Sequence, residues 1–206
     1  MHLSRMLIRI VGFLVLVAAS LAFGLRAVAQ TTPTAMPAVT AADVRFMQEM
    51  IGHHQQAVEM TALVSARTRR AQLRLLAERI GVSQTDEMAL MQRWLRAHGG
   101  SGDATASHDM SEHDGHDISG TGGIPLMPGM LSRTEMAALR AARGARFDRL
   151  FLEGMIRHHG GALTMVEQLL HAPGAAQESS INRFVSDVDA DQRAEIARMR
   201  RMLKPR

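Results

Sequence analysis

The chain has 206 residues, of which 46% are hydrophobic, 21% charged and only 3% aromatic, and its formal net charge is +4. This length accommodates one domain with appendages, and the absence of cysteine excludes disulfides, zinc–thiolate sites and thiol nucleophiles. Charges of both signs alternate along the chain with no basic stripe and interleaved aromatics, so we expect no nucleic-acid partner. The chain is rich in methionine, with 16 residues, and in histidine, with 10. Methionine fills irregular cores, but its thioether also binds soft metals.

Residues 1–29 have the pattern of a secretory signal. Two arginines precede an apolar run over residues 10–25, and an Ala-Val-Ala sequence then ends at Ala29. This order predicts export, with cleavage after about Ala29. We therefore expect a periplasmic or secreted protein, with an uncleaved anchor in the inner membrane as the alternative. The proline-containing residues 30–40 are predicted to be a linker.

An internal repeat organises residues 41–204. The segment that ends at His54 recurs in the segment that ends at His159, with Asp, Phe, Met, Ile and both His at the same spacing. A second pair of segments matches further on, where Gln, Glu, Met and Leu recur. Such a repeat defines the architecture of a chain.

Each repeat is predicted to be a helical hairpin, over residues 41–98 and 132–204. Apolar residues recur at three- and four-residue steps throughout both halves. Glycines follow the first half directly, Ser132 and Glu135 open the second with a capping-box pattern, and a Pro-Gly pair divides its two helices. The sequence shows no convincing strand. It therefore predicts an all-α four-helix bundle made of two repeated helical hairpins.

The predicted loop over residues 99–131 joins the two halves. It is rich in Gly, Ser, Asp and His and contains His113 and His116. Such a segment is typical of a flexible linker. Its histidines are either solvated or additional metal ligands, and both interpretations stay open.

Paired histidines flanked by methionines are the residues that predict a function. Adjacent residues on a helix point about 100° apart, so both rings of a pair can flank one seam. Imidazole with thioether suits Cu(I), whereas imidazole alone also accepts Cu(II), Ni(II) or Zn(II). The candidate metal ligands in the helices are Met50, His53, His54, Met60, Met91, Met155, His158, His159, Met165 and Met199.

Each ligand histidine should also bond a carboxylate or carbonyl through its second ring nitrogen. The candidate carboxylates are Glu49, Glu59, Glu153 and Glu167. A methionine stripe alone is more often core filling, and a lone buried histidine is usually structural. Two histidine pairs in the same methionine context favour metal binding.

Two other functions remain as alternatives. A helical interaction module with structural histidines is one, and a metal-dependent oxidase is the other. A di-iron oxidase site needs Glu-x-x-His on two helices. Here Glu49 precedes His53 by four residues and Glu153 precedes His158 by five. We therefore expect a protein that is not an enzyme.

These motifs resemble the bacterial domain of unknown function 305 family, whose members include periplasmic copper-binding proteins of the CopM type. The resemblance covers residues 41–204 and rests on the doubled Met-Ile-x-His-His and on the Met-Pro-Gly-Met that ends at Met130. It implies a ferritin-like four-helix fold, an exported location, and copper binding or copper resistance. The ligands it implies are Met50, His53, His54 and Met60, then Met155, His158, His159 and Met165.

The resulting hypothesis is an exported protein that sequesters or carries copper and so contributes to copper tolerance. Its partner is the metal ion, with Cu(I) favoured and Cu(II) the alternative, and a protein that receives the metal is not identified. Gly160 follows the second histidine pair where Gln55 follows the first. The two half-sites need not be equivalent.

Overall fold

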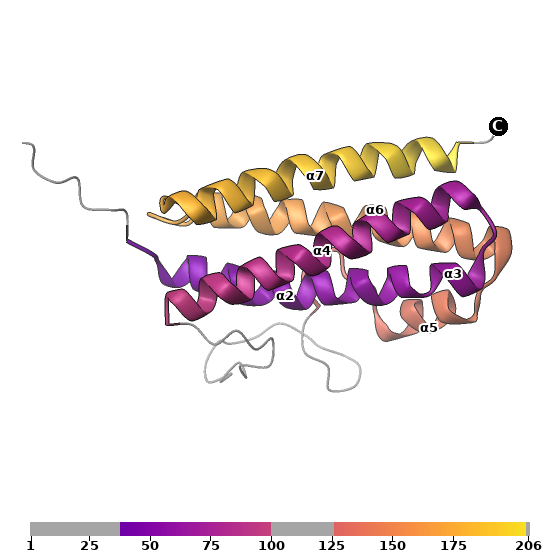
Figure 1. Cartoon of the computed structure of the whole chain (residues 1–206), viewed down its shortest axis with the longest axis horizontal. Coiled ribbons are helices and arrows are strands. Elements are labelled where there is room, and N and C mark those ends of the chain that lie inside the picture. The colour runs from indigo at the N-terminus through magenta and orange to yellow at the C-terminus, as the bar shows by residue number, and fades with distance from the viewer. Residues whose placement is uncertain (1–37, 100–125, 205–206) are drawn as a thin grey trace, which may run out of the picture. The chain divides into compact units, whose positions relative to one another are not determined.

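The computed structural model describes residues 38–99 and 126–204, and these residues form helices without any strand (Figure 1). The predicted all-α class is therefore confirmed. The predicted signal over 1–29, most of the linker, and the loop histidines His113 and His116 lie outside the described residues. The helices are α2 (Ala41–Ala62), α3 (Val64–Arg67), α4 (Ala71–Ala97), α5 (Arg133–Ala141), α6 (Gly144–His171) and α7 (Ser179–Leu203).

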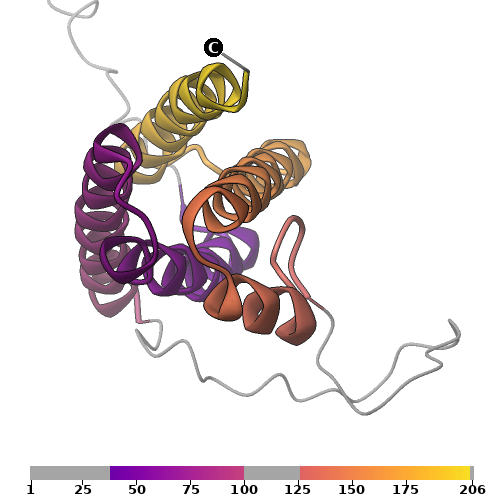
Figure 2. The ribbon, with the colours of Figure 1, turned by 90° about the vertical axis from the view of Figure 1, so that its right-hand side faces the viewer.

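The long helices form two hairpins. Helix α2 packs along α4, helix α6 packs along α7, and the two hairpins meet through α2 and α6. Figure 2 shows this arrangement along the helices, with the short helix α5 beside α6. Within the described ranges, no helix is both long and apolar enough to span a bilayer.

The start of α2 is held by the side chains of Thr40 and Asp43. The amide of Asp43 donates to Thr40 Oγ1 at 3.2 Å, and the amide of Thr40 donates to Asp43 Oδ2 at 2.8 Å. This is a capping box, which satisfies amides that have no partner within the helix. The second oxygen of Asp43 accepts from the Ala176 amide at 2.7 Å. One buried carboxylate thus joins the start of α2 to the turn before α7.

The second half contains a helix break that the sequence did not predict. Ser132 and Glu135 do form the predicted capping box, but the helix that they open ends at Ala141. Residues Ala142 and Arg143 are extended, and Gly144 has φ +57°. Glycine adopts positive φ without the steric cost that other residues incur. Gly144 therefore lets the chain reverse into α6.

The core consists of two apolar clusters separated by a polar layer. One cluster combines the starts of α2 and α7 with the ends of α4 and α6. The other combines the ends of α2 and α7 with the starts of α4 and α6. Along every long helix, buried polar residues lie between the two segments. They are His53, His54, Gln84, His158, His159 and Gln192.

The carboxylate of Glu178 caps α7 and makes its stability sensitive to acid. It accepts from the amides of Ser180 and Ile181 and from the Ser180 hydroxyl. These bonds, the hydroxyl first, lower the pKa of Glu178 from 4.5 to about 2. Because the folded pKa is depressed, the carboxylate stabilises the fold fully above pH 4.5 and loses this effect as the pH falls toward 2.

We predict that Glu178→Ala lowers the free energy of unfolding by about 1 kcal/mol at neutral pH. Near pH 2 the substitution should cost much less, since about half of the wild-type carboxyl is then protonated. Urea denaturation at both pH values measures the difference. Glu78→Ala, which removes an exposed carboxylate inside α4, is the matched control. A cost for Glu178→Ala that did not shrink in acid would contradict this account of the cap.

Candidate metal centre

The polar layer is centred on the crossing of α2 and α6, where His53 and His158 meet. Their ring centroids lie 3.8 Å apart with an angle of 37° between the rings. His158 Nε2 lies 3.0 Å from the His53 carbonyl oxygen, and His53 Nε2 lies 2.9 Å from the Pro128 carbonyl oxygen. A carbonyl oxygen only accepts, so both Nε2 atoms carry the proton. In the neutral rings, Nδ1 therefore carries the lone pair.

The outer histidine of each pair is bound by a glutamate from the partner helix of its hairpin. His54 Nε2 lies 2.6 Å from Glu87 Oε2, and His159 Nε2 lies 2.6 Å from Glu195 Oε2. The histidine side chains are fully buried, whereas those of Glu87 and Glu195 are 17% and 21% exposed. A carboxylate at one ring nitrogen orients the ring and raises the basicity of the other nitrogen, as it does behind metal-binding histidines.

The prediction of which carboxylates bond the paired histidines was wrong. Glu59 pairs with Arg140 at 3.3 Å, and Glu153 pairs with Arg149 at 2.9 Å, both at the surface. Glu49 and Glu167 do not bond the histidines either. Glu87 and Glu195 occupy matching positions in the second pair of repeated segments. That correspondence was the signal from which they could have been identified.

Burial keeps the two central rings neutral. Desolvation lowers the pKa of His53 to about 4, with smaller contributions from the neighbouring histidines. The same desolvation, followed by His53 and His159, lowers the pKa of His158 well below its ordinary value. At neutral pH these rings therefore hold a single proton each, on Nε2.

All four Nδ1 atoms of the histidine pairs are buried and have no hydrogen-bond partner. The amide of Gln84 is likewise unpaired at both of its polar atoms, and Gln192 is unpaired at its oxygen. Buried polar atoms without partners are rare in folded proteins, and each calls for an explanation. An interior that gathers several unpaired lone pairs in one layer has the donor chemistry that a cation needs.

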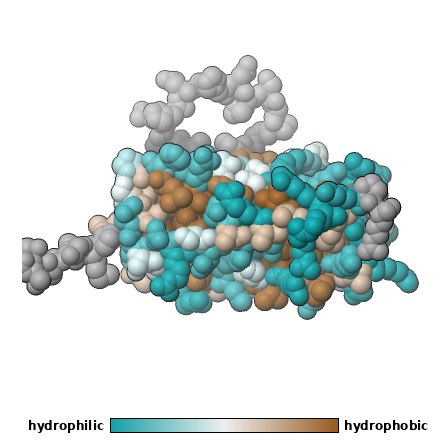
Figure 3. All heavy atoms as spheres, turned by 90° about the horizontal axis from the view of Figure 1, so that it is seen from above, coloured by the Kyte–Doolittle hydropathy of each residue, from teal (hydrophilic) through white to brown (hydrophobic). Residues whose placement is uncertain are grey.

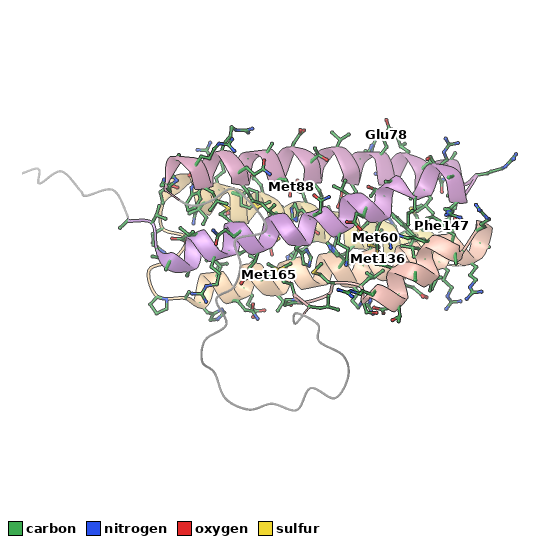
Figure 4. The ribbon with its side chains drawn as sticks, turned by 90° about the horizontal axis from the view of Figure 1, so that it is seen from below. Met60, Glu78, Met88, Met136, Phe147 and Met165 are labelled. Carbon is green, nitrogen blue, oxygen red and sulfur yellow. The ribbon has the colours of Figure 1, made fainter. Side chains whose placement is uncertain are left out.

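The candidate methionines are all buried, but they group differently from the stripes that the sequence suggested. Met50, Met91 and Met165 belong to one apolar cluster, and Met60, Met155 and Met199 belong to the other. Figure 4 shows Met165 and Met60 on opposite sides of the middle of the bundle. The reason is that the polar layer interrupts both α2 and α6, and that the start of α2 packs with the end of α6. Each cluster thus takes two of the candidate methionines from one hairpin and one from the other.

The polar layer is completed by a turn. The sequence analysis did not place this turn in the site. Residues 127–131 lie against α2 and α6, where the Gln56 side chain bonds both backbone groups of Leu131. A Cβ atom on Gly161 would lie 1.8 Å from the Pro128 carbonyl oxygen. Only glycine at this position lets the turn approach α6 closely enough to bond His53.

Among the described residues, no group of three or more His, Asp or Glu side chains is arranged to hold a metal ion. His98 and His171 are exposed and bond carbonyls of their own helices, at Trp94 and Glu167. The layer's own candidate donors are therefore four imidazole nitrogens. The apolar cluster on each side adds four buried thioethers.

The comparisons with known proteins place this arrangement in a family. The family model described as Domain of unknown function (DUF305) matches residues 43–203. A DUF305 fragment from Deinococcus radiodurans is 29% identical, with a TM-score of 0.64 over 81% of this chain and 98% of that one. A DUF305 protein from Streptomyces coelicolor is 26% identical, with a TM-score of 0.64 over 79% and 90%.

A third solved structure is CopM in the Cu(II)-bound form. It is 25% identical, with a TM-score of 0.59 over 78% of this chain and 94% of that one. No curated protein matches the chain.

Proposed function

The chain belongs to the DUF305 family, and from this premise we propose that it is an exported copper-binding protein whose histidines and methionines hold the metal. The observation that carries the proposal is the set of four buried Nδ1 atoms without hydrogen-bond partners. Each ring is held by its other nitrogen, so Nδ1 is the nitrogen that each ring has available for a metal.

The donor set favours Cu(I). Imidazole binds several transition metals, but thioether sulfur selects soft ions, of which Cu(I) is the main biological one. Met50 lies one turn before His53 and His54, and Met155 stands in the same relation to the second pair. Residues three and four apart share one face of a helix. Each histidine pair is thus accompanied by a sulfur on its own helix.

The similarity to CopM in the Cu(II)-bound form supports copper as the metal. We propose that the protein binds copper without turnover and that it works in the periplasm or outside the cell. Sequestration lowers the concentration of free copper, which is how the protein would contribute to copper tolerance. Copper here is cargo, and the residues of the layer serve to accept and retain it.

We predict that Glu87→Gln combined with Glu195→Gln weakens copper binding about 10–100-fold, the usual cost of losing a carboxylate behind a metal-binding histidine. Glutamine keeps an oxygen that accepts from Nε2 but removes the negative charge. Competition for Cu(I) against a chromophoric chelator measures the change.

The matched control is Glu59→Gln with Glu153→Gln, which removes two exposed carboxylates from the same hairpins. This control should bind copper like the wild type. Equal affinity of the Glu87/Glu195 variant and the control would show that the carboxylates do not support the metal centre.

A further inference from the structure

One end of the bundle is built from three stretches that contain no acidic residue. They are residues 60–77, 136–147 and 196–204, which come from the α3–α4 region, the α5–α6 junction and the end of α7. Together they hold Arg67, Arg69, Arg70, Arg74, Arg140, Arg143, Arg146, Arg198, Arg200, Arg201 and Lys204. We call this set the basic end.

Hydrogen bonds tie the three stretches together. Arg70 donates from Nη2 to the Met202 carbonyl at 2.8 Å, which joins the start of α4 to the end of α7. Arg143 donates from Nη1 to the Ala66 carbonyl at 3.4 Å, which joins the α5–α6 junction to α3. The basic end faces the viewer in Figure 2 and lies on the right in Figure 3, where hydrophilic side chains cover much of it. The start of α2 lies at the opposite end (Figure 1).

The positive charge of the basic end is largely uncompensated. Of its side chains, only Arg140 takes part in an ion pair among the residues that the structure describes, with Glu59. Most of the others are exposed, including Arg69, Arg146 and Arg201. Sequence patterning had suggested that the charges alternate along the helices. Folding instead brings together three stretches that lack acidic residues, and this concentrates positive electrostatic potential at one end of the bundle.

We propose that the basic end docks the protein on an anionic phospholipid bilayer. Arginine binds phosphate through two parallel hydrogen bonds, and all but one of these cations are arginine. A single-stranded nucleic acid would need aromatic side chains on which its bases could stack. The only aromatic residue in the three stretches is Phe147, which is fully buried. The basic end therefore offers phosphate binding without base stacking, which suits lipid headgroups.

The test is sedimentation of the full chain with vesicles of phosphatidylcholine alone or of phosphatidylcholine and phosphatidylglycerol in equal parts. The neutral vesicles measure any binding by the apolar leader. The wild type should bind the anionic vesicles more tightly, and this difference should disappear at high salt. The variant Arg69→Glu/Arg146→Glu/Arg201→Glu, with one change in each stretch, should bind the anionic vesicles at least about 100-fold more weakly.

The control is Arg45→Glu/Arg93→Glu/Arg183→Glu, which reverses three exposed arginines on α2, α4 and α7 away from the basic end. It changes the net charge by the same amount as the first variant and should keep most of the wild-type binding to anionic vesicles. Equal binding of the wild type to both kinds of vesicle, or an equal loss in both variants, would overturn the proposal. Tighter binding of single-stranded DNA than of anionic vesicles at the same salt would also overturn it, because the partner would then be a nucleic acid.

Discussion

Replacing His53, His54, His158 and His159 together by alanine should weaken Cu(I) binding by more than about 100-fold. The loss of a carboxylate that merely orients a ligand costs 10–100-fold, so the loss of the nitrogen donors themselves should exceed that range. The measurement is competition against a chromophoric chelator, with circular dichroism to verify that the helices remain. His98→Ala with His171→Ala removes two exposed histidines and should leave the affinity unchanged.

A milder variant keeps this prediction testable if the replacement of all four histidines prevents folding. His54→Leu with His159→Leu fills most of the space, and the unpaired Glu87 and Glu195 are partly exposed, so water can solvate them. It should fold and still lose most of its Cu(I) affinity. A folded variant that bound copper as tightly as the wild type would exclude the outer histidines as ligands.

Gly161→Ala should lower the free energy of unfolding by about 2–3 kcal/mol, the cost of forcing a methyl group into a well-packed interior. The new Cβ would lie 1.8 Å from the Pro128 carbonyl oxygen and 2.4 Å from its carbon, so the turn must move. The movement would also take the carbonyl away from His53 Nε2. We therefore expect weaker copper binding in addition to lower stability.

The adjacent Gly160 provides the control. It lies in the same helix, but a Cβ at this position would meet no atom within 4 Å. Gly160→Ala should stabilise the protein by about 0.5–1 kcal/mol, because alanine favours the helix. Denaturant unfolding of both variants compares the two positions directly. If Gly161→Ala were as stable as Gly160→Ala, the close contact of the turn with α6 would be wrong.

The sequence predicted the elements of the fold better than it predicted their contacts. The repeat ending at His54 and His159 correctly indicated two helical hairpins, because helical periodicity and capping residues are local signals. The break at Ala142 was missed, since it follows from a glycine at positive φ amid good helix formers. That position carries no apolar pattern that distinguishes a break from a continuous helix.

The partners of the histidines depend on contacts between distant segments. Glu87 lies 33 residues from His54, and Pro128 lies 75 residues from His53. Periodicity alone reports which face of a helix is apolar and not which residue of another helix meets it. The repeat did contain part of the answer, because Glu87 and Glu195 are matched positions in its two halves.

The division of the methionines could not be derived from one helix at a time. On α2, Met50 and Met60 follow one stripe, yet they end in different apolar clusters because the histidine layer lies between them. The basic end likewise depends on how the helices are paired and not on any single helix. Arginines that are far apart in the chain come together only when the starts of α4 and α6 meet the end of α7.

The most direct test of the metal centre is nitrogen-15 NMR of the histidine rings during titration with Cu(I). In the metal-free protein, Nδ1 of the central rings His53 and His158 should carry no proton, while Nε2 of all four core histidines is protonated and bonded to its oxygen. Stoichiometric Cu(I) should shift the Nδ1 resonances of these rings while Nε2 stays protonated and bonded to its oxygen. Copper that bound tightly while the four Nδ1 resonances remained unchanged would contradict the proposed centre.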